Sequence, residues 1–152
     1  MSSPVLLCTD GSDQATKAVA AGLALLAPGS TVVIVTVLDE PDPTLLTGTG
    51  FAGGVVSPEE FDQQMTAADQ DALRIVAETR TALGLPDVEG KVLEGAPGPA
   101  ICAYATEVGA AAIVTGSAGR GGIKRAVLGS VSDHVVRHAG CPVIVAGQHA
   151  VE

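Results

Sequence analysis

Aromatic residues are nearly absent from this sequence. It contains no Trp, one Tyr and two Phe, and aromatic residues make up 2% of its 152 residues. Hydrophobic residues nevertheless reach 47%, so the core must be built from Val, Leu, Ile and Ala. The length is that of one ordinary domain. We therefore expect residues 1–152 to form a single domain with an aliphatic core.

Basic residues are also scarce. Eight Lys and Arg against seventeen Asp and Glu give a formal net charge of −9. Binding to nucleic acid or to an anionic membrane needs a basic face, so the balance argues against both partners. No apolar run approaches the length of a membrane span, and the N-terminal residues lack the pattern of a signal peptide. These observations predict a cytoplasmic protein.

Groups that typically bind metal ions are few and badly spaced. Cys8, Cys102 and Cys141 lie in apolar surroundings and form no C-x-x-C pair, so we expect them to be buried and reduced. His134 and His138 stand four residues apart, a spacing that can bind zinc on a helix. No third ligand accompanies them, and we expect no metal site.

Five apolar segments have the length and composition of β-strands. Four are near-continuous apolar runs, which is typical of strands buried on both faces of a parallel sheet. Val88–Glu94 alternates more and is expected nearer an edge. The segments are Pro4–Thr9, Thr31–Leu38, Val88–Glu94, Ala110–Thr115 and Pro142–Gly147.

Helical patterns alternate with these strands. One of them begins at Ser57, with Pro58 and Glu60 completing a capping-box signal, and its apolar stripe from Phe61 to Leu83 is expected to be core. Gly84 and Pro86 should end it. Other helices are expected near Ala15–Leu26, over Pro97–Val108, and after Gly129. The alternation predicts a doubly wound parallel α/β sandwich, in which ligands bind beyond the carboxyl ends of the strands.

Two common nucleotide-binding motifs are missing or misplaced. No Gly-Lys-Ser/Thr triplet occurs, which excludes a Walker A loop. Gly48, Gly50 and Gly53 spell G-x-G-x-x-G, but they do not follow a strand directly and do not open a helix, so we exclude dinucleotide binding there. They lie in the Gly- and Pro-rich segment Asp39–Val56, which we expect to be a surface loop, with a lid over a site as the alternative.

The stretch from Thr115 to Val136 combines glycine with positive charge at the end of the fourth strand. Its glycines let backbone amides turn toward an anion. Ser130 is the predicted N-cap of the next helix, whose N-terminus favours phosphate. Three of the eight basic residues lie in this stretch, namely Arg120, Lys124 and Arg125, and a fourth, Arg137, follows it directly. The residues predict a phosphate site, and the alternative is an ordinary glycine-rich connection.

One spacing within this stretch is specific. Gly116, Gly119, Gly129 and Ser130 fit G-x2-G-x9-G-(S/T), and the chain resembles the ATP-binding universal stress proteins. The resemblance extends to "DGS" after the first strand, "VTVLDE" at the second and "CPVIVA" at the last. It implies a single domain with a five-stranded parallel sheet in the order 3-2-1-4-5 and helices on both faces.

The resemblance also implies a site for ATP, with Mg2+ as a companion of the triphosphate. Asp10 would lie near the adenosine half, Val37 would contact adenine through its backbone, and Gly116 and Ser117 would lie against ribose and phosphate. Arg120 lies inside the signature, and from that place we expect it to clamp phosphate. The residues expected to hold the phosphates are Gly119, Gly129, Ser130, Val131 and Ser132.

The family further implies a homodimer whose last strands, here Pro142–Gly147, pair across the two-fold axis. The function expected is that of a nucleotide-dependent stress regulator with an unknown protein partner and at most slow ATP hydrolysis. The sequence leaves ATP, ADP, AMP and cyclic AMP open. Alternative functions are a nucleotide-free homodimeric interaction module and, through "TDGSD", an adenylating enzyme of the ATP pyrophosphatase type.

Overall fold

Strands and helices alternate along the whole of the described chain. The computed structural model describes residues 3–38, 55–117 and 128–147. The predicted loop and G-x-G-x-x-G motif within residues 39–54 lie outside the described residues, as do Gly119, Arg120, Lys124 and Arg125. The elements are β1 (Val5–Cys8), α1 (Asp13–Leu23), β2 (Val32–Val37), α2 (Pro58–Leu83), β3 (Glu89–Leu93), α3 (Pro97–Val108), β4 (Ala112–Gly116), α4 (Ser130–His138) and β5 (Val143–Ala146).

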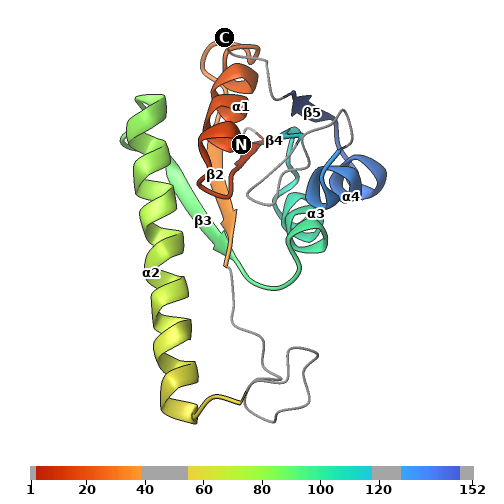
Figure 1. The fold of residues 1–152 in the computed structure, drawn as a ribbon. Helices are drawn as coiled ribbons and strands as arrows, with labels where there is room; N and C mark the ends of the chain where they lie inside the picture. The colour runs from red at the N-terminus through yellow and green to blue at the C-terminus, as the bar shows by residue number, and fades with distance from the viewer. Residues whose placement is uncertain (1–2, 39–54, 118–127, 148–152) are drawn as a thin grey trace.

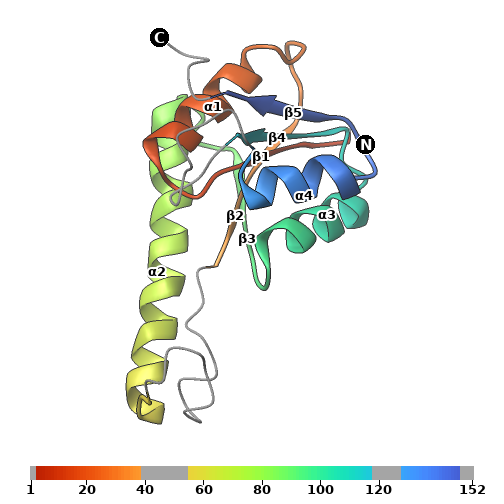
Figure 2. The same cartoon turned by 45° about the vertical axis from the view of Figure 1, so that its right-hand side comes forward.

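The sheet confirms the predicted doubly wound α/β architecture. Its five strands run in the order β3-β2-β1-β4-β5, and all of the pairings are parallel. β1 lies at the centre, where Val5 pairs with Val32 of β2 and with Ala112 of β4. β3 is one edge, as its alternating sequence predicted, and β5 is the other (Figure 2).

Two aliphatic cores lie on the two faces of the sheet. Successive side chains of a strand point to opposite faces, so Leu6 packs with α3 and α4 while Leu7 packs with α1 and α2. Both leucines are fully buried. Each face is thus covered by two helices, as expected. The core on the α3 and α4 side also contains Val33, Val35, Ile101, Ile113 and Val135, and the other contains Val5, Val19, Ile34, Val76 and Val114.

Local capping signals set the bounds of α2. The Ser57 side chain accepts a hydrogen bond of 3.1 Å from the backbone amide of Glu60, and Pro58 is the first helical residue. Gly84 ends the helix in the left-handed conformation with φ of 66°, which glycine adopts without a steric cost. The predicted start and stop of this helix are therefore confirmed.

The apolar stripe of α2 is core over only part of its length, which corrects the sequence prediction. The buried residues of the helix begin at Ala72 and continue with Ile75, Val76 and Thr79. Phe61 and Met65 are only partly buried and belong to neither core. A helix of 26 residues is about 39 Å long, whereas a strand of six residues spans about 20 Å. The first half of α2 therefore extends past the sheet (Figure 1).

The three cysteines differ in burial, contrary to the expectation that all would be buried. All are free; Cys8, at the end of β1, is buried, and Cys102 and Cys141 are partly exposed at the rim of the same core. Burial raises the pKa of the Cys8 thiol to about 12, because the thiolate would lose its hydration. None of the helices in the described ranges is both long and apolar enough to span a membrane.

The raised pKa of Cys8 predicts a loss of stability at alkaline pH. The unfolded chain loses the thiol proton near pH 9, while the folded chain keeps it, so the free energy of unfolding falls as pH rises between the two values. Between about pH 8 and pH 10 we expect Cys8 to contribute about 1 kcal/mol of this fall. Urea unfolding at both pH values measures it. The fall should shrink most in Cys8→Ala and less in Cys102→Ala, whose thiol also has a raised pKa but is only partly buried; equal falls in wild type and Cys8→Ala would contradict the prediction.

Candidate functional site

The carboxyl ends of three neighbouring strands meet at one edge of the sheet. Asp10 follows β1, Val37 ends β2, and Gly116 ends β4. Because the strands are parallel and in register, these residues are brought to the same edge although they are far apart in sequence. α1 and α4 begin at this edge too (Figure 2). This is the edge at which open parallel sheets bind their ligands.

The loop between β1 and α1 holds the carboxylate of Asp10. Gly11 turns the chain with φ of 84°, and its amide donates to Thr9 Oγ1 at 3.1 Å. The amide of Ser12 donates to Asp10 Oδ1 at 2.9 Å. Ser12 also caps α1, since its hydroxyl accepts from the amide of Ala15 at 3.1 Å. Asp10 is thus a half-buried carboxylate, oriented by the backbone, at the end of the central strand.

The backbone of Val37 faces the end of β1. The carbonyl of Val35 accepts from the amide of Thr9 at 3.0 Å, while the amide of Leu38 donates to Leu93 on β3 at 2.7 Å. Backbone groups of alternate residues in a strand point to the same side, so Val37, like Val35, presents its N–H and C=O toward β1. β1 itself has ended there, at Cys8. A planar base placed at this point would meet the backbone groups of Val37.

The connection between β4 and α4 is closed by hydrogen bonds to Ser117. The carbonyl of Ser117 accepts from the amide of Gly129 at 2.7 Å and from the hydroxyl of Ser132 at 3.2 Å. The amide of Ser117 donates to Ala146 at 2.9 Å, which extends the pairing of β4 with β5. The segment that carries Gly119 and Arg120 therefore leaves and returns at one point, beside the start of α4.

Gly129 is the N-cap of α4, and the predicted N-cap at Ser130 is wrong by one residue. The carbonyl of Gly129 accepts from the amide of Asp133 at 2.9 Å, so Ser130 is already helical. No described side chain caps the helix, in contrast to the Ser12 cap of α1. The amides of Ser130 and Val131 lie in the first turn, where a helix has unpaired donors and the positive end of its dipole.

Ser132 holds the start of α4 rather than presenting a free hydroxyl. Its side chain is buried, with 2% exposed. The hydroxyl lies 3.1 Å from the carbonyl of Gly129 and 3.2 Å from that of Ser117. A hydroxyl with two carbonyl acceptors in reach is engaged within the protein. In this structure the expected phosphate contact can therefore come only from the amide of Ser132.

Comparison with known proteins assigns the chain to a family. The model of the universal stress protein family matches residues 1–147. The chain belongs to the universal stress protein family. A curated universal stress protein of Thermus aquaticus is 32% identical over 145 residues, which covers 95% of this chain and 98% of the relative.

Solved structures of universal stress proteins share the fold. One, described as a complex with cAMP, has a TM-score of 0.63 and 26% identity, and the match covers 95% of this chain and 96% of the other. Another, from Archaeoglobus fulgidus in complex with dAMP, has a TM-score of 0.55 and 25% identity, and the match covers 96% and 98%. Nucleotide binding is therefore found among the structural relatives of this universal stress protein.

Eight of the ten site residues expected from the sequence lie within the described ranges. All eight stand at the carboxyl edge of the sheet or in the first turn of α4, and Gly119 and Arg120 lie outside the described residues. Gly11 and Ser12, which shape the Asp10 loop, were not singled out from the sequence. The signal was present in "DGSD", since Gly permits a positive φ and Ser before Asp is typical of a helix start.

The bonds of Ser132 predict a structural role for its hydroxyl. Ser132→Ala should lower the free energy of unfolding by about 1 kcal/mol, because a buried hydrogen bond to the closing carbonyls is lost. Ser130→Ala is the matched control, because Ser130 lies two residues earlier in the same turn and is exposed. This variant should change the free energy of unfolding by less than about 0.5 kcal/mol. Urea unfolding of both variants measures the difference. Equal effects would show that the Ser132 hydroxyl does not hold the loop.

Proposed function

We propose that this universal stress protein binds ATP at the carboxyl edge of its sheet. The observation that carries the proposal is the hydrogen bond from Gly129 to Ser117. It sets the N-terminus of α4 beside the end of β4, at the edge of the sheet that also carries the ends of β1 and β2. The first-turn amides of α4, which can bind phosphate, and the backbone groups of Val37, which can meet a base, therefore lie at the same edge of the sheet.

The two halves of the nucleotide would use different parts of this edge. The adenosine half lies between the carboxylate of Asp10 and the backbone of Val37. The phosphates lie against Gly116, Ser117 and the first-turn amides of α4, from Gly129 to Ser132. Gly119 and Arg120 complete the cradle from the segment between Ser117 and Gly129. No cluster of three or more metal-ligating residues exists among the residues described, so Mg2+ would be held by phosphate oxygens and water.

The solved relatives support an adenine nucleotide, and the charge of this chain supports ATP among such nucleotides. The relatives are described with cAMP and dAMP, each of which has one phosphate. Here Arg120, Lys124 and Arg125 follow β4 within an acidic chain. Three cations in the segment that precedes α4 in the sequence suit a ligand with several phosphates better than one with a single phosphate.

We further propose a binding and signalling role in the cytoplasm, with residues 1–152 acting as one domain. The described residues at the edge offer carboxylate, hydroxyl and amide groups suited to holding a nucleotide, so any ATP hydrolysis would be slow. A homodimer would form through Pro142–Gly147. β5 is an edge strand, and all four of its residues are only partly buried, so pairing with a second copy would cover an apolar edge that otherwise invites aggregation.

Gly129→Val tests whether ATP binds at the start of α4, because the variant should alter the site and leave the fold intact. Gly129 has φ of −64° and ψ of 163°, which Val adopts readily, so the variant should fold. The added side chain crowds the cradle at the start of α4. We expect its affinity for ATP, measured by titration calorimetry, to fall roughly tenfold or more. ADP, AMP and cyclic AMP titrated into the wild type give the order of preference.

Gly140→Val is the control for this variant. It makes the same change at the other end of α4, where an added Cβ meets no atom within 4 Å, and it should bind ATP like the wild type. If the wild type itself fails to bind ATP or the other adenine nucleotides, the chain is a nucleotide-free interaction module. If Gly129→Val binds as tightly as Gly140→Val, the site lies elsewhere.

A further inference from the structure

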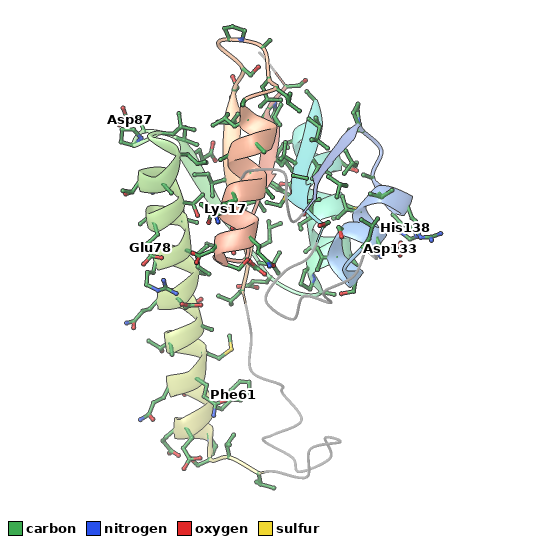
Figure 3. The ribbon with its side chains drawn as sticks, turned by 45° about the horizontal axis from the view of Figure 1, so that its top comes forward. Lys17, Phe61, Glu78, Asp87, Asp133 and His138 are labelled. Atoms are coloured by element: carbon green, nitrogen blue, oxygen red, sulfur yellow. The ribbon has the colours of Figure 1, made fainter. Side chains whose placement is uncertain are left out.

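The first half of α2 presents an apolar stripe that the sheet does not cover. We define the outer stripe as Phe61, Met65 and Ala68. Their spacing of four and three residues places them on one face of the helix, in line with buried Ala72 and Ile75. The described elements that contact α2 are chiefly β2, β3 and α1, and these lie against its second half. Figure 3 shows Phe61 near the end of α2 that is distant from the sheet.

Acidic side chains border the outer stripe on both sides. At 100° per residue, Asp62 and Asp69 fall on one side of the stripe and Glu60 and Asp71 on the other. Residues 57–73 contain no Lys or Arg. Asp71 is paired with Arg74, the first cation of the helix, whereas Glu60, Asp62 and Asp69 form no ion pair within the described ranges. The surface is therefore an apolar stripe between two negative margins.

We propose that the outer stripe docks a basic amphipathic helix of another protein. A partner with apolar residues at i, i+4 and i+7 and with Lys or Arg on both flanks would complement both the stripe and its margins. Burial of Phe61 and Met65 would supply the affinity, and the acids would supply the orientation. The outer stripe lies where α2 extends past the carboxyl edge of the sheet, and the proposal does not rest on nucleotide binding.

Charge distinguishes this partner from the other possible occupants. The preceding segment, Asp39–Gly54, carries Asp39, Glu40 and Asp42 and no base, so it has no cation that could neutralise the margins. A second copy pairing through its own α2 would do the same, with acid facing acid. A basic partner is the occupant that both covers the part of the stripe that remains exposed and neutralises its margins.

A designed helical peptide tests the proposal on the full chain without nucleotide. The probe has Leu at the a and d heptad positions and Lys at the others, and its counterpart has Glu in place of Lys. We expect the Lys peptide to bind and the Glu peptide not to bind, by fluorescence anisotropy of labelled peptide. Phe61→Gln/Met65→Gln should weaken the Lys peptide about tenfold or more, and added salt should weaken it further.

Leu73→Gln is the matched control on the same helix. Leu73 is 64% exposed but lies off the stripe, so its replacement should change the affinity less than about twofold. Equal binding by the double variant and the control would overturn the proposal, because it would reduce the interaction to attraction by net charge. So would a drop of several degrees in the melting temperature of the double variant alone, which would mean that the chain itself covers the stripe. The proposal would also be overturned if the wild type formed a dimer or larger oligomer that Phe61→Gln/Met65→Gln does not form, because a second copy of the chain would then be the occupant.

Discussion

Every part of the candidate site depends on the parallel pairing of β1 between β2 and β4. That pairing sends the ends of three strands to one edge, and it leaves the backbone of Val37 facing the point where β1 stops. An aliphatic core makes the pairing possible, because strands of Val, Leu and Ile can be buried on both faces. Leu6 and Leu7, adjacent in β1, are each fully buried on opposite sides. The central strand thereby fixes both the core and the position of Asp10.

The closure at Ser117 sets the N-terminus of α4 at this edge. One carbonyl accepts from Gly129 and from Ser132, so the residue that follows β4 is tied directly to the start of α4. A helix whose N-cap is glycine has no capping side chain to accept hydrogen bonds from its first amides. Glycine at position 129 therefore lowers the stability of the helix end and leaves these amides as donors for an anion.

Local signals in the sequence were sufficient for the fold and for the sheet edge at which the expected site residues within the described ranges lie. The Ser57 and Gly84 ends of α2 could be predicted because caps depend on neighbouring residues. The N-cap of α4 was misplaced by one residue because Ser is preferred over Gly at N-caps. In the structure Gly129 is the N-cap and Ser130 is the first helical residue. The role of Ser132 depends on Ser117, fifteen residues away, which no local pattern encodes. The apolar spacing of α2 gave the face of the helix but not whether the sheet reaches Phe61.

The central claim is that this universal stress protein holds an adenine nucleotide, and the most direct test is to look for one that co-purifies. Freshly purified protein would be denatured, and the released small molecules identified by ultraviolet absorbance and mass spectrometry. A site of roughly micromolar affinity or better should retain its ligand through rapid purification. The account predicts near-stoichiometric ATP or ADP. An empty protein that also fails to bind added ATP would contradict it and leave the glycine-rich connection as a structural turn.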